Sequence, residues 1–130
     1  MPDVETVIVT RLLAYEGLAA LVGTRVYPLL LPQSPTLPAV TYQRIDAPRE
    51  ERFGGDPVAY PRFQIDSWAK TYAGAKAVAT QVRGALQLWR TTATDPQIMD
   101  SDIESDEDLY EPDTGLYRVR ADYIITHPET

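Results

Sequence analysis

Residues 100–113, DSDIESDEDLYEPD, contain eight carboxylates and no Lys or Arg. Carboxylates at this density can bind a calcium ion, work as a general acid and base, or form the solvated face of a strand. The 130-residue chain has a net charge of −7, yet outside this stretch it holds 12 basic and 11 acidic residues. The acidity therefore belongs to one segment, and the three interpretations have to be weighed there.

A calcium loop is imitated only in part. Acids occupy every other position from Asp100 to Asp108, and Glu111 stands at the twelfth position. The sixth position, which needs glycine for a sharp turn, is Ser105, and a turn rather than an exit helix follows Glu111. A catalytic pair would need a carboxyl group whose pKa is raised by burial, and a run this polar offers little apolar cover. Neither interpretation explains the spacing.

A strand explains the spacing better, because acids alternate with Ser101, Ile103 and Ser105. The alternation predicts a strand with one solvated face, which would carry Asp100, Asp102, Glu104 and Asp106. Residues 111–115, EPDTG, predict a turn into a last strand. That hairpin would bring Arg118 and Arg120 opposite some of the acids.

The rest of the composition excludes several function classes. The chain has no cysteine and a single histidine, His127, so disulfides, thiolate metal sites, cysteine nucleophiles and histidine-based triads are not expected. The sequence contains no G-x-S-x-G, P-loop, G-x-G-x-x-G or H-E-x-x-H motif. Without clustered Lys and Arg, sequence-nonspecific nucleic-acid binding is not expected. With neither a signal peptide nor an apolar run of about 20 residues, we expect no membrane segment and a cytoplasm-like environment.

The elements that would position these residues suggest one domain over residues 1–130. Apolar residues recur at helical spacing in residues 3–15, 16–23 and 71–90. Apolar and polar residues alternate in residues 39–47, 60–69 and 116–127, and prolines confine residues 25–32 to a sheet edge. The order predicts an α+β fold, with two helices packed on one face of a mostly antiparallel sheet of roughly four to five strands. A charged hairpin loop is expected at about residues 47–59.

Four stretches spread over nearly the whole chain carry a resemblance to a known family. They are LAALVGTRVYPLLLP, LPAVTYQRI, FQIDSWAKTYAGAKAVATQVRGAL and DTGLYRVRADYII. The Q-I-D-x-W-A core followed by T-Y-x-x-A is the most specific part, and V-G-x-R-V-Y-P is the next. In these residues the sequence resembles the tail completion proteins of tailed bacteriophages and related prophages. The acidic segment is longer and more charged than this family leads us to expect.

The resemblance implies a virion protein without enzymatic activity and without a cofactor or metal. It implies a ring, commonly of six copies, at the head-proximal end of the tail tube, where the ring ends tube growth and joins the tail to the head. The partners would be other copies of the chain, the tail tube protein and the head connector or stopper protein. The protein would assemble in the host bacterial cytoplasm and reside in the tail or neck of the virion.

Two sets of residues are candidates for roles in such a ring. The charged hairpin would contact the tail tube or the connector through Arg49, Glu50, Glu51, Arg52 and Phe53. The acidic strand face with Asp100, Asp102, Glu104 and Asp106 would line the channel and repel passing DNA, or would simply face the outside solvent. An alternative function is a small acidic module that binds calcium or another protein.

Overall fold

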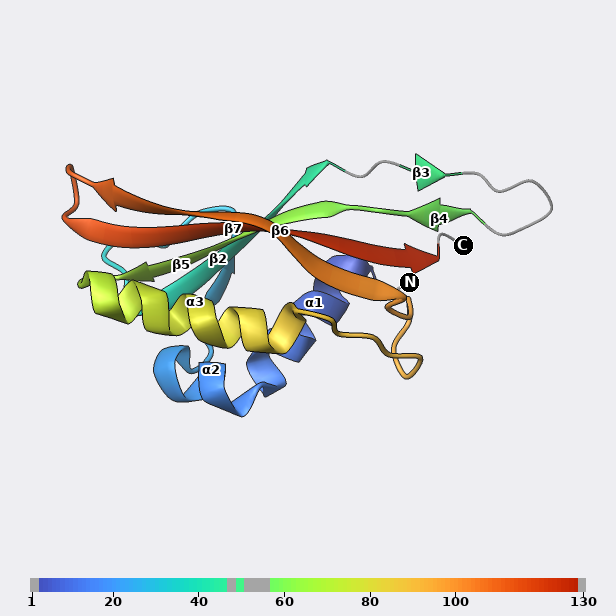
Figure 1. Ribbon diagram of the computed structural model, residues 1–130. Helices are drawn as coiled ribbons and strands as arrows, with labels where there is room; N and C mark the ends of the chain where they lie inside the picture. The colour runs from blue at the N-terminus through green and yellow to red at the C-terminus, as the bar shows by residue number, and fades with distance from the viewer. Residues whose placement is uncertain (1–2, 47–48, 51–56, 129–130) are drawn as a thin grey trace.

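The computed structural model describes residues 3–46, 49–50 and 57–128, in which helices lie on one side of a mixed, curled sheet (Figure 1). The helices are α1 (Val4–Ala14), α2 (Glu16–Val22) and α3 (Tyr72–Leu86). The strands are β1 (Val26–Pro28), β2 (Ala39–Asp46), β3 (Arg49–Glu50), β4 (Val58–Ala59), β5 (Arg62–Ala69), β6 (Asp100–Glu111) and β7 (Leu116–Pro128). The α+β class expected from the sequence is therefore correct.

β1 forms one edge of the sheet, and β6 forms the other. The strands follow the order β1, β2, β5, β7, and β6 pairs with the other side of β7. All these neighbours are antiparallel except β1 and β2, which run parallel, so the sheet is mixed although mostly antiparallel, as expected. The described residues form seven strands rather than the four to five expected, because the short strands β1, β3 and β4 also pair. At the far end, β4 pairs with the last residues of β7, and β3 pairs with β4. The hairpin expected as a loop over residues 47–59 thus contains short paired strands.

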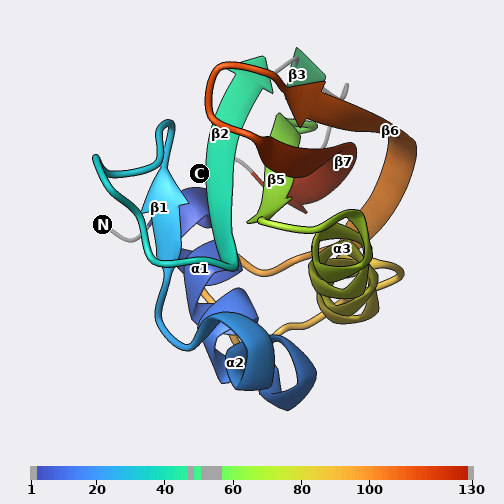
Figure 2. The ribbon, with the colours of Figure 1, turned by 90° about the vertical axis from the view of Figure 1, so that its left-hand side faces the viewer.

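The helices are three rather than the two expected on the sheet. α3 packs on β5 and β7, α2 packs on α1 and α3, and α1 also reaches β1. In Figures 1 and 2 all three lie below the sheet, with α2 farthest from it. Only α3 therefore lies along the middle of the sheet, while α1 and α2 close the core from the side and from below.

The third helix ends earlier than residue 90, where the sequence pattern placed its end. Gln87 has left the helical conformation, and Leu88 has a positive φ of 56°. The backbone N–H of Leu88 donates to the Ser101 carbonyl at 2.7 Å, and that of Ile103 donates to the Gln87 side-chain oxygen at 2.8 Å. Bonding to β6 therefore replaces the last helical turn, a competition that helical spacing alone does not reveal.

The core lies between the helices and the inner face of the sheet. Its largest fully buried side chains are Tyr123, Phe63, Ile8, Leu12, Leu18, Ile65, Leu86 and Ile125. The alternating positions of β5 and β7 supply Phe63, Ile65, Tyr123 and Ile125, as the strand pattern predicts. The opposite face of the sheet carries no described helix, and its side chains are mostly charged or polar, with Trp68 and Ile124 among them.

Candidate assembly surfaces

The acidic segment is a strand, β6, at one edge of the sheet. It pairs with β7 over its whole length, and its pairing register shifts between Ile103 and Ser105. Glu104 is the extra residue at this bulge, and a bulge changes which residues of a strand point to each face. The alternation that the sequence suggests is therefore interrupted in its middle.

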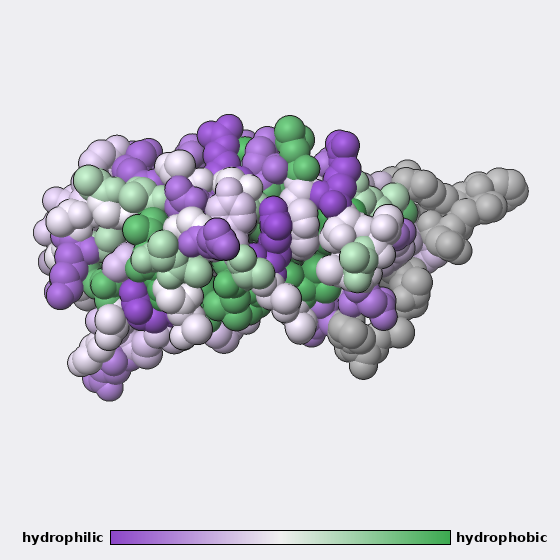
Figure 3. Space-filling view, turned by 90° about the horizontal axis from the view of Figure 1, so that it is seen from below, coloured by the Kyte–Doolittle hydropathy of each residue, from purple (hydrophilic) through white to green (hydrophobic). Residues whose placement is uncertain are grey.

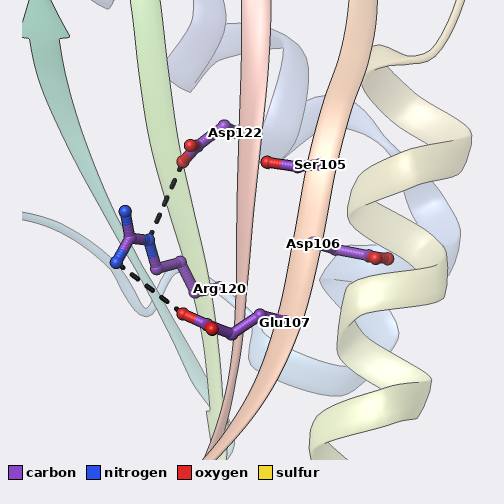
Figure 4. Close-up of a pocket in the computed structure, with 5 residues that line it drawn as sticks. All are labelled: Ser105, Asp106, Glu107, Arg120 and Asp122. Carbon is purple, nitrogen blue, oxygen red and sulfur yellow. Dashed lines mark ion pairs between the residues drawn. The ribbon is translucent and has the colours of Figure 1, made fainter.

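The bulge divides the predicted acids between two faces of the sheet. Before it, Asp100 and Asp102 pair with Thr126 and Ile124, on the outer face. After it, Asp106 pairs with Ala121, whose side chain is buried beneath α3. Figure 4 shows the consequence: Asp106 points toward the helix, while Ser105 and Glu107 lie on the other side of the strand. The single solvated face predicted for Asp100, Asp102, Glu104 and Asp106 is thus wrong for Asp106.

The outer-face acids have nearby partners. The Arg90 guanidinium lies 3.6 Å from the Asp100 carboxylate, and the Gln87 amide donates to Asp102 at 2.7 Å. Glu104, at the bulge, accepts a 2.6 Å bond from Arg62. The side chain of Glu104 is therefore directed across β7 to β5, toward the middle of the outer face.

Three arginines pair with the carboxylates of this outer face in two groups, one around Arg62 and Arg120, which share Asp122, and one around Arg118; together we call them the ion-pair network. The acidic neighbours of these arginines within 4.0 Å are Asp46, Asp66, Glu104, Glu107, Glu111 and Asp122. The contacts predicted across the hairpin are confirmed, because Arg118 lies 2.8 Å from Glu111 and Arg120 lies 3.8 Å from Glu107. With six carboxylates to three guanidinium groups, the network keeps this face negative.

The Q-I-D-x-W segment, Gln64 to Trp68, lies in β5 at the centre of this face. The Asp66 carboxylate accepts bonds from the Gln64 amide at 2.9 Å and from Arg118 at 3.3 Å. Arg118 also lies over the Trp68 ring, 5.0 Å from its centroid, and the Trp68 indole donates to Thr41. Asp66 is only 4% exposed, and this burial raises its pKa despite the neighbouring Arg118. The motif therefore builds a fixed polar centre in the sheet.

On the helix side of β6, Asp108 ties the strand to α3. Its carboxylate accepts a bond from the Tyr72 hydroxyl at 2.7 Å and another from Lys76 at 3.2 Å. The hydroxyl bond, followed by the Lys76 contact, holds the pKa of Asp108 below its usual value. The Tyr117 ring lies between those of Tyr72 and Tyr110, with centroids 6.2 and 4.9 Å away. These contacts fasten the end of the β6–β7 hairpin to the start of α3.

The described surface has several open hollows, among them two of about 440 and 540 Å³ beside the start of β6. Another, of about 200 Å³, is lined by Ser105, Asp106, Glu107, Arg120 and Asp122 (Figure 4). Within the described ranges, no three His, Cys, Asp or Glu side chains are placed to hold a metal ion. β6 is extended, so it does not wrap its acids around a point as a calcium loop does.

The helix-bearing side has no single large apolar area, because hydrophobic and hydrophilic side chains alternate over it in small patches (Figure 3). None of the described helices is both long and apolar enough to cross a membrane.

The charged hairpin is placed only in part. Arg49 and Glu50 form β3, which pairs with Val58 and Ala59 of β4. Glu51, Arg52 and Phe53 lie outside the described residues. The described strands of the hairpin, β3 and β4, lie at the end of the sheet where β4 pairs with the last residues of β7 (Figure 1).

Comparison with known families decides what kind of protein carries these surfaces. The sequence matches the family "Tail completion protein gp17" over residues 6–127. The chain belongs to this family. The Q-I-D-x-W motif, the acidic β6 strand and both edges of the sheet all lie within the matched region, so the surfaces described above are those of a phage tail completion protein, a structural component of the tail.

The fold of this tail completion protein also occurs in a virion whose structure is solved. A chain in the structure of the virion of a native gene transfer agent particle superposes with a TM-score of 0.80 and 22% sequence identity. The match covers 94% of this chain and 92% of that chain. None of the curated proteins compared with the sequence matches it. The fold is thus shared over almost its full length although most residues differ.

Sequence reasoning missed two features of this tail completion protein. Arg62 makes the shortest ion pair of the outer face, and its place two residues before Gln64, in the same strand phase as Asp66, is the signal that could have found it. The second is an exposed pair of leucines after β1, Leu29 and Leu30, for which the sequence holds no signal of exposure.

Proposed function

We propose that this protein forms a closed ring, of six copies, at the head-proximal end of the tail tube, where it ends tube growth and joins the tail to the head connector. The family match over residues 6–127 carries this proposal. The fold found in a gene transfer agent virion supports it, because that particle too has the fold among its components. The protein acts by binding its neighbours in the virion, without catalysing a reaction, and it is located in the tail or neck.

The two sheet edges also support a ring. A symmetric pair would place β6 beside β6 or β1 beside β1, whereas a ring joins two different surfaces of each copy. A β6–β6 contact would bring two acidic edges together, which charge repulsion disfavours. Two copies are therefore expected to associate through unlike surfaces. When each copy is rotated by the same angle relative to the previous one, repetition of this contact can close a ring.

We propose that the outer face of the sheet lines the channel of this ring. That face carries Asp100, Asp102 and Glu104 together with the ion-pair network, so its charge is negative and it would repel DNA passing along the channel. Asp106, which points toward α3, is placed outside the channel in this arrangement. Replacing Asp100, Asp102 and Glu104 together by Lys would reverse the excess of negative charge on this face and should make isolated rings retain DNA at low salt. Rings that remain inert to DNA after this change would reject the assignment.

The charged hairpin from Arg49 to Phe53 is proposed to contact the tail tube or the connector, because its described strands β3 and β4 lie at the end of the sheet where β4 pairs with the last residues of β7. Replacing residues 49–53 by a short Gly-Ser turn should leave the ring intact and abolish joining of heads to tails. Normal joining by that variant would remove the hairpin from the contact.

The ring itself is tested by mass and by tail length. The ring, whether free or released from tails, should have a mass six times the 14.5 kDa of one chain when it is measured by native mass spectrometry. Tails assembled without the protein should be irregular in length and should not attach to heads. Tails of normal length that join heads without it would overturn the proposal. A calcium-dependent rise in stability would instead favour the calcium-binding alternative.

A further inference from the structure

Two leucines in the turn after β1 are held out into solvent. The Leu29 side chain is 61% exposed and that of Leu30 is 79% exposed. Leu29 has a positive φ of 65°, a conformation that residues with a side chain rarely adopt. Its N–H nevertheless donates to the Tyr42 carbonyl at 2.8 Å, and the Leu30 N–H donates to Pro28 at 2.7 Å. The turn is thus a fixed projection that exposes apolar side chains, and strain of this kind is typical of functional segments.

A groove with an apolar floor and a charged rim lies between α3 and β6. It has a volume of about 130 Å³, and its floor is formed by the buried side chains Val119, Ala121 and Tyr123. Ala79 and Ile103 lie beside this floor, while Lys76, Thr80 and Arg83 of the helix add polar and charged groups to the lining. Apolar cavities of roughly 150 Å³ accept a molecule of the size of benzene, so this groove has room for one aliphatic side chain. Asp106 borders it on the strand side, because the bulge at Glu104 turns that residue toward α3.

The turn and the groove lie on opposite sides of the molecule. β1 is at one edge of the sheet, and β6 is at the other. In Figure 2 the connection that leaves β1 lies at the left, while α3 and β6 lie at the right. Two complementary features on opposite sides are what a head-to-tail contact between copies requires, since each copy uses one of them toward each neighbour.

Charge favours the same pairing of surfaces. From Thr24 to Gln43, a segment that includes β1 and the leucine turn, Arg25 is the only charged residue. That segment can approach the acidic β6 edge without placing carboxylate against carboxylate. In a symmetric pair, the leucine turn of one copy would face the turn of the other, or β6 would face β6. Neither arrangement would bring the leucines of one copy to the groove of another.

We propose that the Leu29–Leu30 turn of one copy inserts into the groove between α3 and β6 of the next copy. This inference rests on the proposed ring and names its subunit contact. Within the ring, the outer sheet face would then be free to point toward the channel, because both neighbours are engaged through the sides of the sheet.

A disulfide between copies tests the contact directly, since the chain has no native cysteine. The double variant Leu30→Cys with Ala79→Cys should give, under mild oxidation, a ladder of cross-linked species that ends at the closed ring. Each single variant should give no ladder beyond a dimer. The pair Leu30→Cys with Leu13→Cys is the matched control: Leu13 is also exposed but lies on α1, outside the groove, so no ladder is expected.

A charge at the turn provides the second readout. Leu30→Lys should reduce the fraction of rings at least tenfold at a given protein concentration, whereas Leu88→Lys, at a leucine that is 65% exposed elsewhere, should leave it unchanged. Wild-type rings of the expected mass that do not cross-link through residues 30 and 79 would overturn the contact and leave the ring standing. Loss of tail joining by Leu30→Lys with normal rings would assign the turn to another tail protein and also overturn it. Absence of any ring, on tails or in solution, would remove both proposals.

Discussion

The variant Asp66→Asn tests which of two effects on the stability of the native protein is larger at the polar centre of the sheet. One is the loss of hydration of the buried Asp66 carboxylate, and the other is its attraction to Arg118. The Arg118 guanidinium lies 3.3 Å from the Asp66 carboxylate, and Asp66 is 4% exposed. At an effective dielectric constant of about 20, opposite charges at this distance attract by roughly 5 kcal/mol. The loss of hydration of a buried carboxylate costs several kcal/mol in the opposite direction. Because the two effects are of similar size, the direction of the pKa shift has to decide between them.

Burial raises the pKa of Asp66 above its ordinary value of 3.8, so hydration loss is the larger effect. The native protein then holds this proton to a higher pH than the unfolded chain does. Between about pH 4 and the raised pKa, the native state binds more protons, and the contribution of Asp66 to stability falls as the pH rises. Asn resembles the protonated acid and does not titrate. D66N should therefore equal the wild type near pH 4 and become the more stable protein by pH 7.

The size of that gain measures the shift, since each unit of raised pKa corresponds to about 1.4 kcal/mol. Unfolding in urea, followed by the fluorescence of Trp68 and Trp89 from pH 4 to pH 8, gives both stability curves. Asp66→Ala is the contrasting variant: it removes the acceptor of both Gln64 and Arg118 and should cost about 2–4 kcal/mol at every pH. If D66N were less stable than the wild type at pH 7 by about 1.5 kcal/mol, the value of a charged hydrogen bond, the ion pair would be the larger effect and the reasoning would be wrong.

Two further predictions concern the helices. Asp3 caps α1 by accepting a 2.9 Å bond from the Thr6 N–H, so Asp3→Ala should lower the free energy of unfolding by about 1 kcal/mol while Asp3→Asn, which can still cap, should lose less. Because hydrogen bonds from Thr6 lower the pKa of Asp3, this stabilisation should be full above about pH 4 and should vanish as the pH falls through the lowered pKa. If the free energy of unfolding depended on pH in the same way for the wild type and Asp3→Ala, this prediction would be contradicted. In α3, a Cβ at Gly84 would lie 2.5 Å from the Tyr15 hydroxyl, so Gly84→Ala should destabilise the protein despite a helix-propensity gain of about 1 kcal/mol. The same substitution in a Tyr15→Phe background should cost less, and a double-mutant cycle without coupling would refute the clash.

The sequence contained most of the sheet but not the faces of its acidic strand. Alternation in residues 39–47, 60–69 and 116–127 identified β2, β5 and β7, because one side of each strand faces the core. β6 has little apolar side to fix its phase, so its bulge is decided by pairing with β7. The sequence did hold a trace of the bulge, since Asp106, Glu107 and Asp108 are consecutive acids that break the alternation.

Neither the polar centre around Asp66 nor the exposed leucine turn could be predicted from the sequence alone, and the reasons differ. Asp66, Arg118 and Trp68 are brought together by the register of β5 with β7, which is a long-range property. Leu29 and Leu30 belong to an apolar run, and an apolar run predicts burial unless the neighbouring structure is known. Residue type therefore identified the elements, while exposure and partner had to come from the fold.

The division of acids by the bulge separates two tasks that one uninterrupted strand could not perform. With regular alternation, Asp100, Asp102, Glu104 and Asp106 would all have pointed outward, and the side toward α3 would have carried serines and Ile103. The extra residue leaves Glu104 to meet Arg62 on the outer face and turns Asp106 and Asp108 toward the helix. Asp108 then fastens β6 to Tyr72 and Lys76, which keeps the edge strand close to α3 and fixes the width of the groove between them. The outer face retains its network of fixed charge, so the surface proposed for the channel and the surface proposed for the neighbouring copy are built from alternate residues of the same strand.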